Sequence, residues 1–182
     1  MRVITGSARG RRLETLEGED VRPTTDRIKE AVFSIIQFET EGRTFLDLFA
    51  GSGQMGIEAL SRGAAQAFFV DSAKRSVEVI KRNLKTTRLE DNARVFQMDY
   101  HGFLSMNTTP VDIAFLDPPY RSGLLQEALP LTAKAMRDTG VIIVENPLDE
   151  ALEAQYGDFV PDRQYRYGKI SITTFRHRDF VS

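Results

Sequence analysis

The sequence predicts an α/β fold in which a mostly parallel β-sheet is covered by helices on both faces. The 182 residues are 41% hydrophobic and 27% charged, which is typical of one globular core. From residue 43 onwards, short apolar runs that suit buried strands alternate with segments of helical periodicity. This alternation indicates parallel strands joined by helical crossovers. Near the C-terminus, two strand-like runs flank Gly168 and predict a hairpin that adds at least one antiparallel strand at an edge.

The elements follow in order along the chain. The expected strands are 44–49, 67–70, 94–98, 112–116 and 141–144, and the closing hairpin joins 164–167 to 170–175. The expected helices are 57–62, 74–84, 100–104 and 124–136, with a tight glycine turn at 51–56.

Residues 1–42 are expected to form an extension to this core. Residues 2–5 and 12–16 can pair as a small hairpin, and an amphipathic helix then follows with apolar residues at helical spacing over 28–36. The extension and the core at 43–182 are expected to form a single domain.

Composition excludes several classes of function. The chain has no cysteine, which excludes disulfides, thiolate metal ligands and a cysteine nucleophile. His101 and His177 have no metal-like partners, so no metal is expected. The N-terminus lacks an apolar signal core, and no window approaches the roughly 18 apolar residues that span a bilayer. We expect a cytoplasmic monomer without a membrane partner.

A net charge of −2 means that attraction by the whole molecule cannot be the main route to a nucleic acid. Any such contact must be local. Arg2, Arg9, Arg11 and Arg12 form one local basic run without an acid. This run either contacts phosphate or belongs to a solvated hairpin.

A glycine-rich turn follows the first core strand and reads Asp-Leu-Phe-Ala-Gly-Ser-Gly-Gln-Met-Gly from Asp47 to Gly56. Ligands of open parallel sheets lie at the carboxyl ends of the strands, and glycine lets the backbone approach them closely. Asp71 follows the next strand, about 20 residues beyond Gly51, a spacing that suits a carboxylate bound to ribose hydroxyls. The pattern predicts a cofactor that contains adenosine.

Two cofactors compete for this turn. A nicotinamide dehydrogenase would hold a pyrophosphate there, whereas a methyltransferase would hold the aminoacyl and ribose parts of S-adenosylmethionine. Asp47 favours S-adenosylmethionine, since a carboxylate repels pyrophosphate but pairs with an ammonium. A turn that only packs helix on strand is the third reading. Asp99, after the third strand, is either an acceptor for the adenine amino group or a turn residue. The candidate cofactor-binding residues are Asp47, Phe49, Ala50, Gly51, Ser52, Gly53, Asp71, Ser72, Asp99 and Tyr100.

The most specific feature is Asp117-Pro118-Pro119-Tyr120, at the end of the fourth core strand. An exocyclic amine of a nucleobase is a poor nucleophile because its lone pair is delocalised into the ring. The Asp117 carboxylate and the Pro118 carbonyl can each accept a hydrogen bond from one of the two N–H groups of this amine. These hydrogen bonds would hold its lone pair in line with the methyl group of the cofactor. The prolines stiffen the turn, and Tyr120 offers a ring for stacking the base. The alternative is a plain turn that ends a strand.

The chain resembles the RsmD family, which methylates N2 of guanine 966 in 16S ribosomal RNA. Segments 22–33, 47–56, 58–63, 117–120 and 167–169 carry the resemblance. It implies a class I S-adenosylmethionine-dependent methyltransferase (Rossmann-like) fold with a seven-stranded sheet. It also implies an N-terminal extension that helps to bind RNA or to close over the site, and a substrate presented during small-subunit assembly.

Two interpretations of the segment with Arg22, Thr24 and Arg27 are open. These side chains face the cofactor or RNA, or the segment only caps a helix. The expected target is a single-stranded or flipped guanine, since a base inside a duplex is closed to the reaction. Other possibilities are an adenine-N6 or cytosine-N4 methyltransferase acting on DNA or RNA, a glutamine side-chain methyltransferase, and an RNA-binding assembly factor without turnover.

Overall fold

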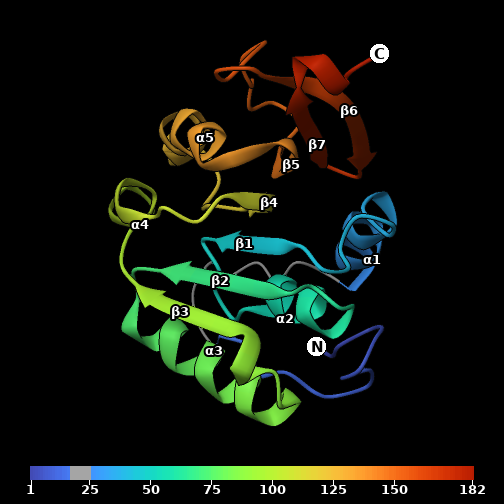
Figure 1. Cartoon of the computed structure of the whole chain (residues 1–182), viewed down its shortest axis with the longest axis vertical. Helices are drawn as coiled ribbons and strands as arrows, with labels where there is room; N and C mark the ends of the chain where they lie inside the picture. Colours follow the sequence, from blue (N-terminus) through green and yellow to red (C-terminus); the bar gives the residue numbers. More distant parts are fainter. Residues whose placement is uncertain (17–25) are drawn as a thin grey trace.

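A computed structural model describes residues 1–16 and 26–182, and a single seven-stranded sheet forms its centre (Figure 1). The strands are β1 (Thr44–Leu48), β2 (Gln66–Asp71), β3 (Ala93–Gln97), β4 (Val111–Leu116), β5 (Met136–Pro147), β6 (Phe159–Tyr167) and β7 (Ile170–His177). Their order is β3-β2-β1-β4-β5-β7-β6, with β7 antiparallel to both neighbours. This confirms the class I methyltransferase fold. The strand order reverses between β1 and β4, which is where open α/β sheets bind ligands.

Helices cover both faces of the sheet, as predicted. The α-helices are α1 (Asp26–Ile35), α2 (Gln54–Ser61), α3 (Lys74–Thr87), α4 (Tyr100–Met106) and α5 (Leu124–Ala135). Short 3₁₀ turns occupy Glu90–Asn92 and Arg178–Phe180. One hydrophobic core lies under α1, α2 and α3, and a second lies under α4 and α5. Figure 1 shows α3 at the β3 end of the sheet and α5 beside β5.

The closing hairpin forms one edge of the sheet by antiparallel pairing, as predicted. β7 lies between β5 and β6, and β6 forms the edge. The middle of β7 is continuously buried, whereas side chains of β6 beyond its first residue are exposed or half-buried. A strand buried on both faces suits the interior of a sheet, and a polar strand suits its edge. β5 also begins at Met136, which was expected to end the preceding helix.

The glycine turn is shorter than predicted, because α2 begins at Gln54 rather than at residue 57. Gly56 therefore lies inside the helix. A Cβ at this position would lie 2.4 Å from the Phe69 ring on β2, so Gly56 allows the helix to pack closely on the sheet.

The N-terminal hairpin forms only in part. Arg2 and Arg12 make one isolated antiparallel bridge, and Val3 and Leu13 add backbone hydrogen bonds to Arg11 and Met1 of 2.9 and 3.0 Å. The segment instead packs on α2. No helix within residues 1–16 and 26–182 is long and apolar enough to span a membrane.

Candidate functional site

A cavity of about 940 Å³ lies at the carboxyl ends of the parallel strands, beside the point where strand order reverses. The loops after β1, β2, β3 and β4 all contribute to its wall. All four residues of the Asp117–Tyr120 tetrad line it, as does every candidate cofactor residue except Gly53. The structure therefore brings the two predicted halves of the site together.

Gly53 faces the core rather than the cavity. It has a positive φ of 79°, and a Cβ there would lie 3.1 Å from Ile80 and 3.3 Å from Phe69. Its role is to let the turn enter α2. Gly51, by contrast, lines the cavity, and the nearest atom to an added Cβ would be in Leu16 at 3.9 Å. Phe49, also in the wall, has a φ of 67°, an unfavourable conformation for a bulky residue that is typical of functional sites.

Asp47 lies beneath this turn and is 2% exposed. Its Oδ2 accepts a hydrogen bond from the Gly56 N–H across 2.9 Å, so it holds the first turn of α2. Burial raises the pKa of Asp47 to about 8. The carboxyl is therefore largely protonated at neutral pH when no cation lies nearby. Charge repulsion of a pyrophosphate is accordingly a weaker argument than the sequence suggested.

Asp71 ties two loops together at the end of β2. One carboxylate oxygen accepts from the Gly51 N–H and the other from the Ala73 N–H, each across 2.9 Å. The side chain thus braces the glycine turn while it lines the cavity. Ser72 beside it also lines the cavity.

Asp99 is the N-cap of α4, and its Oδ1 accepts from the Gly102 N–H across 2.7 Å. Both alternatives for Asp99 thus stay compatible with its place, since it caps a helix and also lines the cavity. Tyr100 packs its ring 5.8 Å from that of Phe49 and hydrogen-bonds to Glu127. The two rings form an aromatic wall.

Asp117 continues β4 into the cavity wall, where Pro118 is buried and Pro119 is exposed. Tyr120 donates a hydrogen bond from its Oη to Oε1 of Glu145 across 3.2 Å. Glu145 lies near the end of β5 and is 3% exposed. Sequence reasoning did not include Glu145 in the site, although it is a further acid at a strand end.

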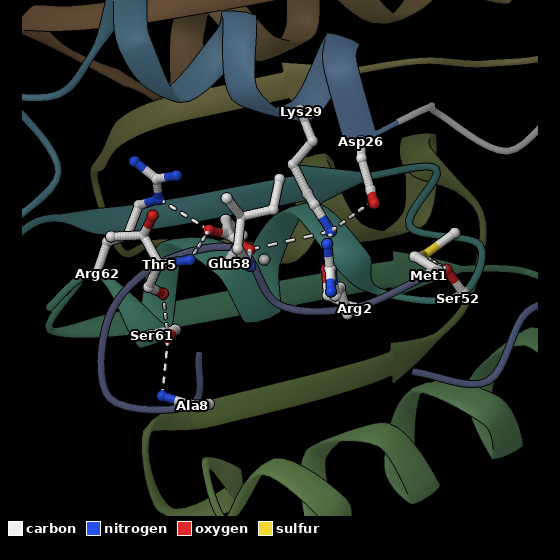
Figure 2. A network of polar contacts seen from close by, with 12 residues as sticks. Met1, Arg2, Thr5, Ala8, Asp26, Lys29, Ser52, Glu58, Ser61 and Arg62 are labelled. Carbon is white, nitrogen blue, oxygen red and sulfur yellow. Dashed lines mark hydrogen bonds and ion pairs between the residues drawn. The ribbon is translucent and has the colours of Figure 1, made fainter. Parts of the chain in front are cut away.

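The N-terminal segment also contributes to the cavity through Met1, Thr15 and Leu16, which sequence reasoning missed. Figure 2 shows how it is held. The buried carboxylate of Glu58 on α2 accepts from the backbone N–H groups of Ile4 and Thr5 across 2.9 and 3.0 Å.

Lys29 completes this network from α1, and its side chain is fully buried. Its Nζ donates to the Arg2 carbonyl across 2.7 Å and lies 3.9 Å from both Glu58 and Asp26. Burial lowers the pKa of Lys29. The charge pattern of the sequence gives no sign of this buried pair, because its members lie far apart in the chain.

Arg2, Arg9, Arg11 and Arg12 do not line the cavity. The loop that carries Arg9 docks at Ser61, where Ser7 and Ala8 donate hydrogen bonds of 2.8 and 2.9 Å. Ser61 ends α2, roughly 12 Å from the glycine turn for a helix of this length. Arg2, Arg9, Arg11, Arg12 and Arg27 are all exposed. Arg22 and Thr24 lie outside the described residues.

The donor set of the cavity fits S-adenosylmethionine. An aromatic wall formed by Phe49 and Tyr100 suits a flat adenine, and the Asp71 carboxylate at a strand end suits ribose hydroxyls. Asp47 offers a buried carboxyl to an ammonium, and Gly51 leaves room beside the backbone. Within the described parts of the chain, no group of three His, Asp or Glu side chains could hold a metal ion.

Comparisons with known proteins agree with this geometry. The family model described as "Conserved hypothetical protein 95" matches residues 1–176. The chain is 38% identical to "Putative rRNA methyltransferase YlbH" of Bacillus subtilis (strain 168), over 98% of this chain and 100% of that protein. It is 34% identical to "Ribosomal RNA small subunit methyltransferase D" of Escherichia coli (strain K12), over 97% of this chain and 89% of that protein. The solved structure titled "Putative methyltransferase yhhF from Escherichia coli" has a TM-score of 0.87 and 34% identity, with 97% of each chain covered.

Proposed function

The chain belongs to the family described as Conserved hypothetical protein 95, and on this premise we propose that it is an S-adenosylmethionine-dependent methyltransferase of ribosomal RNA. The finer proposal is that it methylates N2 of a guanine in 16S ribosomal RNA, at a position of the guanine 966 type. One observation carries the proposal. The Asp117–Tyr120 tetrad, which suits an exocyclic amine, borders the same cavity as the Phe49–Ser52 loop, which suits the cofactor. The names of the relatives at 38% and 34% identity support the choice of ribosomal RNA.

The cofactor-facing residues hold and orient S-adenosylmethionine. Asp71 binds the ribose, Asp99 and the aromatic wall of Phe49 and Tyr100 hold the adenine, and Asp47 faces the ammonium. When bound, S-adenosylmethionine supplies an electrophilic methyl group on a sulfonium sulfur. Positioning and electrostatics from the protein then suffice for catalysis.

The tetrad acts on the guanine amine. The Asp117 carboxylate and the Pro118 carbonyl each accept a hydrogen bond from one N–H group of the amine. These two hydrogen bonds turn the nitrogen lone pair towards the methyl group. Tyr120 stacks on the base. Asp117 does not need to be a strong base, because the amine becomes acidic only after it has gained the methyl group. Its proton then leaves to Asp117 or to water.

Binding of RNA is expected to involve residues 1–42 and a particular conformation of the target base. We propose that this N-terminal segment contacts RNA through its exposed arginines and that the target guanine is flipped or single-stranded. A pre-structured loop of 16S ribosomal RNA, presented in a small-subunit assembly particle, would meet this requirement.

The test is transfer of labelled methyl groups from S-adenosylmethionine to 16S ribosomal RNA, both free and in assembly particles that lack the modification. The proposal expects label in guanine, and expects none with Asp117→Ala. Label in adenine or cytosine would replace guanine as the target, and label in protein would contradict the RNA assignment.

A further inference from the structure

A second cavity, of about 660 Å³, lies next to the first. Tyr120 lines both cavities. The second is formed by the loop after β4, the end of β5 and the turn between β6 and β7. The loops after β1, β2 and β3 do not reach it, so cofactor binding leaves this cavity unexplained.

Its walls are held in place by backbone pairing. Pro147 at the end of β5 pairs in register with Ile170 of β7, and the Leu148 N–H donates to the Lys169 carbonyl across 3.2 Å. Buried Asn146 donates from Nδ2 to the carbonyls of Pro147 and Glu150 across 3.0 and 2.9 Å. The cavity is therefore a built feature of the sheet rather than a space between loose loops.

The lining combines apolar and cationic groups. Pro147, Leu148 and Ile170 supply apolar surface, and Leu148 is 43% exposed. Arg121 and Lys169 supply two positive charges.

One acid, Asp149, lines the same cavity and accepts from Arg121 Nη2 across 2.6 Å. Both side chains of this ion pair are more than 60% exposed. Because an exposed ion pair contributes little stability, an incoming anion can compete for Arg121. The backbone of Arg121 has a φ of 55°, a conformation that non-glycine residues adopt mainly where structure or function requires it.

We propose that this second cavity binds the nucleotide next to the target base in the same RNA strand. Its base would lie on Leu148 and Ile170, and its phosphate beside Lys169 and Arg121. Consecutive nucleotides must occupy adjacent sites, and the two cavities share the Tyr120 wall. Apolar surface with cations is the combination that binds single-stranded nucleic acid, and contacts to flanking nucleotides help such enzymes to select their targets. This inference rests on the proposed function.

The first test reverses the charge of Lys169. Lys169→Glu should raise the KM for 16S ribosomal RNA about tenfold, as expected for a lost surface ion pair replaced by repulsion. The kcat and the cofactor Kd should not change. The slope of log KM against log salt concentration should fall by about 0.7, the value for one phosphate contact on a single strand. Lys169→Arg should retain wild-type values because arginine keeps the positive charge, and the salt slope is the readout that a merely structural role for the lysine would not change.

The matched control is Lys81→Glu, which makes the same charge change at an exposed position on α3, at the far end of the sheet (Figure 1). It should leave the KM and its salt slope unchanged. Leu148→Ser tests the contact with the base without changing the contact with the phosphate. It should raise the KM severalfold with an unaltered salt slope.

Binding of protein-free 16S ribosomal RNA to the same variants distinguishes the outcomes. Wild-type binding by both Lys169→Glu and Leu148→Ser, in a protein that still methylates RNA, would overturn the nucleotide subsite and leave the proposed function standing. A defect seen with assembly particles but not with protein-free RNA would assign the cavity to a protein partner and would also overturn it. If the wild-type protein methylates no RNA, the proposed function fails, and the inference fails with it.

Discussion

The hydroxyl of Tyr120 donates a hydrogen bond to Glu145, and this contact joins the loop after β4 to the neighbouring strand β5. Glu145 is buried, so it restrains the aromatic ring from within the sheet. Tyr120 lines both cavities. Its orientation therefore sets both the place where a base can stack and the place where the RNA strand can continue.

The first prediction separates the ring of Tyr120 from its hydroxyl. Tyr120→Ala removes the stacking surface, and kcat/KM should fall roughly 5- to 150-fold, which corresponds to about 1–3 kcal/mol. Tyr120→Phe keeps the ring and loses one hydrogen bond, so kcat/KM should fall by less than about tenfold. Steady-state kinetics with 16S ribosomal RNA measure both. Equal losses in the two variants would show that the hydroxyl, and not stacking, is what matters.

The second prediction divides the acids of the first cavity. Asp117→Ala should lower kcat at least about a hundredfold, the usual cost of losing a group that orients or stabilises the reacting atoms. Its affinity for S-adenosylhomocysteine should stay near the wild-type value. Asp71→Ala should chiefly weaken the cofactor, because Asp71 both lines its site and braces the Gly51 and Ala73 backbone. Calorimetric titration measures affinity in each variant, and an equal loss in both would contradict this division.

The third prediction concerns protons and Asp47. Its pKa of about 8 in the free protein reflects burial, and an ammonium placed beside it favours the carboxylate and lowers that pKa. Binding of S-adenosylmethionine should therefore release a proton at pH 7, and affinity should rise with pH up to about 8. Calorimetry in buffers of different ionisation enthalpy counts the proton. Asp47→Asn keeps an acceptor for the Gly56 N–H and should remove the proton release, whereas a wild-type enthalpy that is the same in every buffer would refute the pairing.

The same carboxyl should make the folded protein less stable as the pH rises, whereas it should make cofactor binding tighter. Between the usual pKa of 3.8 and the folded value of about 8, the folded state binds a proton that the unfolded state has lost. The contribution of Asp47 to the free energy of unfolding should thus be lost as pH rises through this window. Urea titrations from pH 4 to about 8 should show a shallower decline for Asp47→Asn than for the wild type. Parallel curves would exclude a proton on Asp47.

The fourth prediction tests how the N-terminal segment is held. Glu58→Gln removes the buried charge opposite Lys29 and one acceptor for the amides of Ile4 and Thr5, so the free energy of unfolding should fall by about 3 kcal/mol. Cofactor affinity should fall too, because the segment carries Met1 and Leu16 into the cavity wall.

The control for this prediction is Glu30→Gln, which makes the same change at an exposed position on α1. Its stability and cofactor affinity should equal those of the wild type. If Glu58→Gln were no less stable than Glu30→Gln in denaturant titrations, the buried network would not anchor the segment.

Much of the fold could be predicted because local pattern and topology agree. Apolar runs alternating with helical segments fix a parallel sheet, and a parallel sheet brings its strand-end acids to one edge. This is why Asp47, Asp71, Asp99 and Asp117 meet at one cavity. The position of β7 inside the sheet was not predicted, because the hairpin pattern gives two strands without saying which of them pairs with β5.

Parts of the site escaped prediction because they depend on contacts between distant segments. The hydrogen bond that the Gly56 N–H donates to Asp47 requires α2 to begin earlier than its periodicity indicates. The contact between Glu145 and Tyr120 depends on strand register, and the burial of Lys29 depends on the docking of a segment with little regular structure. Charge and periodicity carry no information on such contacts.

The measurement that tests the central claim most directly is mass mapping of the methylated nucleotide in 16S ribosomal RNA. Ribosomal RNA from cells that lack the protein would be treated with the purified protein and S-adenosylmethionine, digested and sequenced by mass. The account predicts one added methyl group on the exocyclic N2 of a single guanine, and none with Asp117→Ala. A methyl group on adenine, on cytosine or on a ring nitrogen of guanine would contradict it.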